Sequence, residues 1–139
     1  MSDSVAITSG KGGVGKTTFA VNLSIAFKKI SDEVFLLDTD LGMANSHVLL
    51  GDNPNYTIAD VISGNKKVSE IIYKNKYGIN LISGGTASNN VLNIENKARY
   101  SILNGIENHL MKYNSLKLIV DIAAGADDNS LIFSMACDR

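Results

Sequence analysis

A glycine-rich segment near the start of the chain has the composition of a phosphate-binding loop. Residues 9–18 read Ser-Gly-Lys-Gly-Gly-Val-Gly-Lys-Thr-Thr and satisfy the pattern G-x-x-x-x-G-K-[ST]. Glycines let successive backbone N–H groups surround a phosphate, and the N-terminus of a following helix adds the positive end of its dipole. In this pattern Lys16 reaches the β- and γ-phosphates, and the Thr17 hydroxyl binds Mg²⁺. The residues expected to contact the nucleotide here are Gly10, Lys11, Gly12, Gly13, Val14, Gly15, Lys16, Thr17 and Thr18.

Three carboxylates follow apolar runs elsewhere in the chain. Asp38 and Asp40 come after residues 34–37, and Asp121 comes after residues 118–120. Acids at the carboxyl ends of buried parallel strands lie at the edge where α/β folds bind ligands. Asp40 is expected to orient the water that attacks the γ-phosphate or to hold the Mg²⁺ shell, and Asp121 to hold Mg²⁺ through water. The predicted metal set is Thr17, Asp38, Asp40 and Asp121, while capping or solvation is the alternative role for Asp38 and Asp40.

Another glycine pair, Gly84–Gly85, lies in the segment Ser83–Ser88. No helix-opening Lys-Ser or Lys-Thr follows it, so a loop at the ligand edge of the sheet is favoured over a further phosphate cradle.

The elements that must position these residues alternate along the chain. Short apolar runs at 5–8, 34–37, 79–82 and 116–120 are typical of strands buried on both faces, as in parallel sheets. Apolar residues at helical spacing predict helices over 19–30 and 102–113, and Thr57 is the expected N-cap of a shorter helix ending near Gly64. The pattern predicts an α/β fold with a mostly parallel sheet, helices on both faces and right-handed crossovers. A final helical stretch over 129–137 has no strand after it, so the sheet is expected to be incomplete.

Length and composition restrict the alternatives. The 139 residues predict one domain, 1–139, and we expect it to be the N-terminal part of a longer protein. Thirteen Lys+Arg against fourteen Asp+Glu imply no strongly basic nucleic-acid surface. The single cysteine, Cys137, excludes a disulfide framework within one chain, and His47 and His109 stand far from any Cys/His cluster. Without a secretory signal or an apolar run of spanning length, the cytoplasm is the expected location.

The segment Gly-Lys-Gly-Gly-Val-Gly-Lys-Thr-Thr at 10–18 resembles the deviant Walker A motif of the MinD/ParA group of P-loop ATPases. The resemblance implies that Lys11 reaches across a dimer interface to the phosphates held by the partner subunit. It makes Lys11, Lys16 and Asp40 the catalytic residues, with Asp40 as the switch I aspartate that positions the attacking water. Asp121 matches the Walker B acid, and Gly125 matches the switch II glycine whose N–H senses the γ-phosphate. The chain reads Asp-Ile-Ala-Ala-Gly at 121–125 and lacks the proline that many members carry there, which bears on hydrolysis rate more than on binding.

Within this group, residues 40–51 look like the D-x-G-x-A-N-x-x-x-x-x-G stretch of the FlhG branch, also called FleN or YlxH, whose members set flagellar number and placement. The resemblance implies an ATPase that uses ATP/ADP and Mg²⁺ and forms a homodimer with ATP in its full-length form. Its partners would belong to the flagellar or positioning machinery, and a C-terminal segment would give peripheral contact with the inner face of the cell membrane. Direct nucleic-acid binding is not indicated.

Other functions stay open on the sequence alone. A septum-site or chromosome-partitioning ATPase shares these motifs, and an ATP-dependent metabolic ligase, such as an amidoligase or a dethiobiotin-synthetase-like enzyme, shares the fold. Lys11 and the segment 40–51 favour the nucleotide switch, whereas ADP release that depends on a carboxylate substrate would favour the ligase. A fragment that neither dimerises nor hydrolyses ATP is the third possibility.

Overall fold

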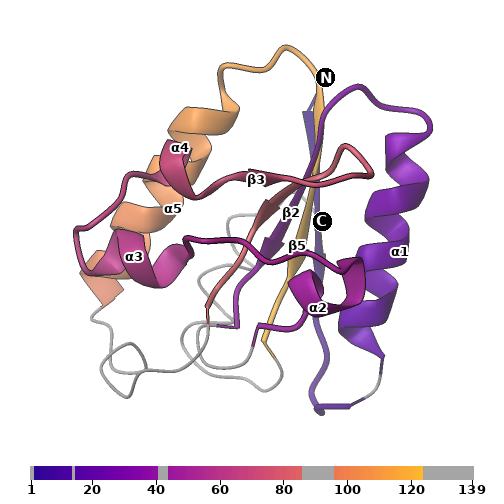
Figure 1. Ribbon diagram of the computed structural model, residues 1–139, viewed down its shortest axis with the longest axis horizontal. Coiled ribbons are helices and arrows are strands. Elements are labelled where there is room, and N and C mark those ends of the chain that lie inside the picture. Colours follow the sequence, from indigo (N-terminus) through magenta and orange to yellow (C-terminus); the bar gives the residue numbers. More distant parts are fainter. Residues whose placement is uncertain (1, 14, 41–43, 86–95, 124–139) are drawn as a thin grey trace.

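The computed structural model describes residues 2–13, 15–40, 44–85 and 96–123 and has a five-stranded sheet at its centre (Figure 1). The strands are β1 (Ser2–Ile7), β2 (Val34–Asp38), β3 (Tyr73–Lys74), β4 (Asn80–Ile82) and β5 (Leu116–Asp121). Their order across the sheet is β1-β5-β2-β4-β3, with β3 antiparallel to β4 and the other pairs parallel. The predicted mostly parallel sheet is confirmed. The sequence reading missed β3 because two residues are too few to show a periodic pattern.

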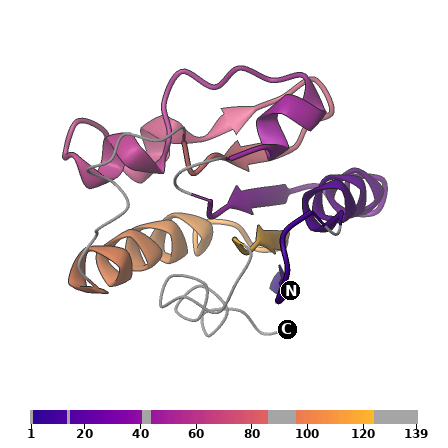
Figure 2. The same cartoon turned by 90° about the horizontal axis from the view of Figure 1, so that it is seen from below.

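Helices cover both faces of this sheet. They are α1 (Lys16–Lys28), α2 (Ser46–Leu50), α3 (Ile58–Ile62), α4 (Val68–Ile71) and α5 (Asn96–Leu110). In Figures 1 and 2, α1 lies on one side of the strands and α3 and α5 lie on the other. The chain crosses the sheet in one direction through α1 and returns through α5 to insert β5 between β1 and β2. Opposite faces for the two helices are what crossovers of a single hand require.

The central strands are buried on both faces, which explains their continuous apolar runs. In β2, Phe35 and Leu37 pack with Ile102 and Ile106 of α5, while Leu36 packs on the other side with residues of α1. Successive side chains of a strand point to opposite faces, so each residue of such a strand enters one of two cores. The prediction of doubly covered strands is confirmed for β2 and β4, whereas the run at 5–8 lies in and just after the edge strand β1, where residues 5–7 are half-buried and Thr8 is exposed.

The buried face of α1 differs from the predicted one. The spacing of apolar residues predicts a face that includes Phe19 and Ile30, but Phe19 is 59% exposed and Ile30, beyond the helix end, is 77% exposed. Leu23 and Phe27 of the predicted face are half-buried and pack against the core, while the fully buried residues of the helix are Ala20, Val21 and Ser24. The Ser24 hydroxyl donates to the Ala20 carbonyl at 2.8 Å, so its burial leaves no unpaired donor. Small side chains on this face let α1 lie close to the sheet.

The other two predicted helices are present with shifted bounds. Thr57 occupies the N-cap position of α3, and its N–H donates to the Asp60 carboxylate at 2.8 Å. The apolar residues Ile102 and Ile106 of α5 are buried as predicted, whereas Tyr113 follows the helix and meets the Phe35 ring edge-on with centroids 5.2 Å apart. The predicted helix over 129–137 lies outside the described residues. Among the helices that are described, none has both the length and the apolar character needed to cross a bilayer.

The register of the parallel strands brings the predicted site residues to one edge of the sheet. Asp121 stands opposite Ile7 on one side and opposite Asp38 on the other, while Leu37 stands opposite Ile82. Because these strands are parallel, the chain leaves β1, β2, β4 and β5 at the same edge. That edge holds the candidate site.

Candidate functional site

The glycine-rich loop joins β1 to α1. Gly13 and Gly15 have φ of +73° and +87°, a left-handed backbone conformation that L side chains rarely adopt. Within the described part of the chain, and apart from each glycine's two neighbours in sequence, no heavy atom lies within 4 Å of a Cβ added at Gly10, Gly13 or Gly15. The loop therefore needs glycine for its backbone path and keeps open space beside that path. Val14 lies outside the described residues.

Lys16 is the first residue of α1, and its ammonium group forms an ion pair with the Asp121 carboxylate at the end of β5. The side chains of Lys16 and Asp121 are 12% and 2% exposed, and the two residues are 105 positions apart. A buried carboxylate is costly unless it is paired. The fold thus places the predicted phosphate-binding lysine directly against the predicted Walker B acid. Thr17 follows Lys16 and is half-buried.

Asp38 is buried at the end of β2 and accepts three backbone hydrogen bonds. The N–H of Asp40 donates to one carboxylate oxygen at 3.1 Å, and those of Asn45 and Ser46 donate to the other at 3.1 and 3.0 Å. These bonds tie together the two ends of the segment that follows β2. They support a role for Asp38 in holding this segment, while its role as a magnesium ligand stays a prediction.

Burial raises the pKa of the Asp38 carboxyl above its usual value, and the negative charge of neighbouring Asp121 acts in the same direction. Backbone hydrogen bonds from Ser46 and Asp40 oppose the shift. Two adjacent carboxylates at one strand edge favour a cation nearby, and Lys16 is one such cation.

Thr39 joins the loops that follow β2 and β5. Its hydroxyl and its N–H both donate to the Asp121 carbonyl, at 3.0 and 3.1 Å, and the hydroxyl accepts from the Ala123 N–H at 3.2 Å. The sequence reading did not single out Thr39. The available signal was a hydroxyl residue between two acids, directly after a buried strand.

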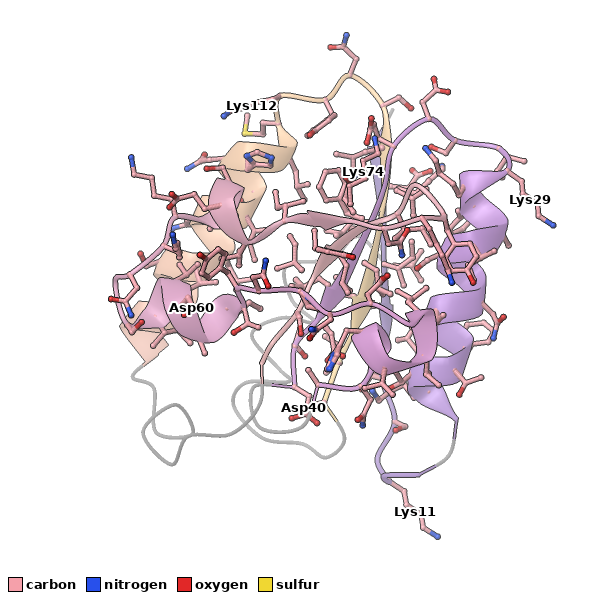
Figure 3. All side chains as sticks on the ribbon, in the orientation of Figure 1. Lys11, Lys29, Asp40, Asp60, Lys74 and Lys112 are labelled. Carbon is pink, nitrogen blue, oxygen red and sulfur yellow. The ribbon has the colours of Figure 1, made fainter. Side chains whose placement is uncertain are left out.

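Asp40 is half-buried at the carboxyl edge of the sheet, and Lys11 is exposed and points away from the molecule (Figure 3). The structure therefore brings Lys16, Asp38 and Asp121 together at the edge where Asp40 also lies, and leaves Lys11 apart from them. Gly125 lies outside the described residues.

The side chains at this edge fit a Mg²⁺ ion that is coordinated partly by the protein and partly by phosphates. Among the residues that the structure describes, no group of three or more His, Cys, Asp or Glu is placed to hold a metal alone. Mg²⁺ usually keeps several waters and is bound through one or two carboxylates together with substrate phosphates. Thr17 and Asp121, beside an open glycine loop, offer that kind of partial coordination.

Comparison with known proteins identifies this edge as that of a known nucleotide-binding domain. Residues 5–132 match the family model of the CobQ/CobB/MinD/ParA nucleotide-binding domain. The chain belongs to this family. The match includes the glycine-rich loop, Asp38, Asp40 and Asp121.

Relatives of this MinD/ParA-type domain include the antiactivator FleN of Pseudomonas aeruginosa, 34% identical over 135 residues. That match covers 97% of this chain and 48% of FleN, so the chain spans about half the length of this curated relative.

Solved structures of MinD share the fold. MinD of Pyrococcus horikoshii, complexed with Mg-ADP, has a TM-score of 0.83 and 29% identity, covering 99% of this chain and 56% of that one. The MinC:MinD cell division complex of Aquifex aeolicus has a TM-score of 0.78 and 28% identity, covering 98% of this chain and 53% of that one.

Proposed function

We propose that this MinD/ParA-type domain binds ATP with Mg²⁺ and hydrolyses it. The observation that carries the proposal is the contact between Lys16, at the end of the glycine-rich loop, and buried Asp121 at the carboxyl edge of the sheet. The Mg-ADP bound by the MinD of P. horikoshii supports the same choice of ligand.

Each residue of the site has a defined part in this proposal. The backbone N–H groups of residues 10–15 and the Lys16 ammonium bind the phosphates. Thr17 and, through water, Asp121 would hold Mg²⁺, which would neutralise charge on the phosphates. Asp40 orients a water molecule for in-line attack on the γ-phosphorus, so that a phosphorus–oxygen bond forms to water while the bond to the β–γ bridging oxygen breaks.

We further propose that hydrolysis switches a dimer that regulates flagellar number or placement. The identity to FleN over 97% of the chain supports this branch, and exposed Lys11 is free to reach the phosphates of a second copy. ATP would favour a homodimer in the cytoplasm that binds the flagellar or positioning machinery, and peripheral membrane contact would come from a further segment. These activities belong to a whole protein, and the chain spans about half of FleN.

The direct test is phosphate release from Mg·ATP by the full-length protein. Wild type should release phosphate, and Lys16→Ala should not, because the variant lacks the cation that contacts the phosphates. Lys74→Ala is the matched control, since Lys74 is exposed and lies in β3, at the edge of the sheet opposite β1; Figure 3 shows it well away from Asp40. Release that occurs only when a carboxylate substrate is added would replace the ATPase with a ligase, and the absence of release would contradict both.

A further inference from the structure

Gly84 lies directly against the backbone of Asp40. The segment Ser83–Gly85 follows β4 and is buried at the carboxyl edge. A Cβ added at Gly84 would stand 2.3 Å from the Asp40 carbonyl oxygen, 2.7 Å from its carbonyl carbon and 2.9 Å from the Asp38 carbonyl oxygen. All three atoms belong to the backbone, so no side-chain rotation can relieve the contact.

Gly85, which follows Gly84, contacts Ala44, the residue that comes after positions 41–43. The Ala44 N–H donates to the Gly85 carbonyl at 3.2 Å, and the Ile58 N–H donates to the Ser83 carbonyl at 2.8 Å. The Gly84–Gly85 pair therefore contacts Asp40, which precedes residues 41–43, and Ala44, which follows them. Ile58, at the start of α3, holds the residue before the pair through its bond to Ser83. Strand pairing brings the two segments together, since β4 lies beside β2 with Ile82 opposite Leu37.

Positions 84 and 85 require glycine for different physical reasons. Gly85 has a φ of +112°, so any side chain there is strained whatever space surrounds it. Gly84 is not among the glycines with positive φ, so a left-handed backbone is not its reason for being glycine. The close approach of Asp40 is what excludes a side chain at position 84.

We propose that Gly84 is a positioning residue for ATP hydrolysis, because its missing side chain sets where the Asp40 backbone, and hence the Asp40 carboxylate, lies. This inference rests on the proposed function, in which Asp40 orients the attacking water. A side chain at position 84 would displace Asp40. The glycine-rich loop joins β1 to α1, Lys16 begins α1 and Asp121 ends β5, and β2 separates β5 from β4. The effect should therefore fall on the chemical step rather than on nucleotide binding.

The test compares Gly84→Ala with Gly105→Ala in the full-length protein. Among the described residues, a Cβ at Gly105 meets the side-chain atom Val68 Cγ2, at 3.1 Å, which needs to shift by only a few tenths of an ångström, and alanine suits the interior of α5. For Gly84→Ala, Mg·ADP affinity should stay within about twofold, while single-turnover hydrolysis should fall about tenfold to a hundredfold, the scale of a misplaced reacting group. Gly105→Ala should change neither quantity.

Coupling to Asp40 separates positioning from general damage. In the Asp40→Ala background, Gly84→Ala should cause no further loss of hydrolysis, because the carboxylate it positions is already absent. Three results would each overturn the inference but not the proposed function. They are undiminished hydrolysis in Gly84→Ala, a loss of ADP binding equal to its loss of hydrolysis, and an additional loss of hydrolysis in the double variant. A wild-type protein that binds but never hydrolyses ATP would overturn the proposed function and the inference together.

A second variant decides the matter if Gly84→Ala does not fold. Replacing the Ala44 amide with an ester removes the N–H that donates to Gly85 and leaves every side chain in place. Hydrolysis should again fall with ADP binding retained, since the segment loses its other tie to the glycine pair. Unchanged hydrolysis in the ester variant would overturn the inference.

Discussion

At the scale of single residues, three carboxylates at one sheet edge have three different surroundings. Asp38 is enclosed by backbone N–H groups, Asp121 pairs with Lys16, and Asp40 lies half-buried at the edge. Environment rather than residue type therefore distinguishes a carboxylate that holds a segment, one that pairs with Lys16 and one that lies half-buried at the edge.

Replacing Asp40 tests its part in the reaction. Asp40→Ala should keep or tighten ATP binding, because it removes negative charge near the γ-phosphate, and should trap the ATP-bound dimer. Turnover should fall about a hundredfold or more, since an oriented water is needed in the transition state rather than the ground state. Single-turnover hydrolysis and size-exclusion chromatography with ATP measure both effects.

Exposed Asp32 provides the control for that substitution, and Asp32→Ala should behave as wild type. Near-normal turnover in Asp40→Ala would remove Asp40 from the mechanism. Loss of ATP binding together with turnover would reassign it to the magnesium shell.

The raised pKa of Asp38 predicts a pH dependence of stability. The folded protein holds the Asp38 proton more tightly than the unfolded chain, in which the pKa is close to 3.8. The stability from this group is therefore fully present below that value and is lost as pH rises through the raised folded pKa. The free energy of unfolding of wild type, minus that of the non-titrating Asp38→Asn, should fall as pH increases from about 4. Denaturant unfolding across a pH series measures it, and a difference that stays constant or grows would contradict the prediction.

At the scale of elements, α1 shows how a face can be mispredicted. The spacing of its large apolar residues favours a face through Phe19, which is exposed, whereas Leu23 and Phe27 of that face pack against the core and Ala20 and Ser24 are fully buried. Apolar residues lie on more than one side of this helix, so their periodicity alone does not select the buried side. Close approach to the strands favours the side with the smaller side chains.

Stability measurements on α1 should follow the observed face. Val21→Ala should lower the free energy of unfolding by about 2 kcal/mol, because it removes two buried methyl groups. Phe19→Ser should change it by less than about 0.5 kcal/mol, as is usual for exposed positions. Denaturant unfolding of both variants checks this, and a larger loss in Phe19→Ser would restore the face predicted from the sequence.

At the scale of the whole molecule, nucleotide binding should stabilise the native state. A ligand present at a hundred times its dissociation constant adds about 2.7 kcal/mol. Mg·ADP should therefore raise the melting temperature by several degrees, and Lys16→Ala should abolish the rise. A folded wild-type sample that shows no shift at millimolar Mg·ADP would contradict binding by this chain.

The two lysines of the glycine-rich loop should separate binding from assembly. Lys16 pairs with Asp121 inside the candidate site of the same chain, whereas Lys11 is exposed and points outward (Figure 3). In the full-length protein Lys11→Ala should retain ADP affinity but lose ATP-dependent dimerisation and hydrolysis, measured by light scattering and phosphate release. Lys29→Ala, at the far end of α1, serves as the exposed-lysine control. Loss of ADP binding as severe as that of Lys16→Ala would remove the reason for a shared dimer site.

The sequence by itself determined the glycine-rich loop between a strand and a helix, the acids that end two strands and the alternation of strands with helices. These features are local, because the spacing of glycines and the length of an apolar run depend on neighbouring residues. The family resemblance rested on the same local motifs, and the match over residues 5–132 confirms it.

Tertiary structure alone decided which distant residues meet. The strand order inserts β5 between β1 and β2, which brings Asp121 to Lys16 on one side and to Asp38 on the other. The same order sets β4 beside β2, so that Gly84 meets the Asp40 backbone. No local pattern encodes the strand order. The order depends on how the crossover helices pack on the two faces of the sheet, and this packing involves residues far apart in the sequence.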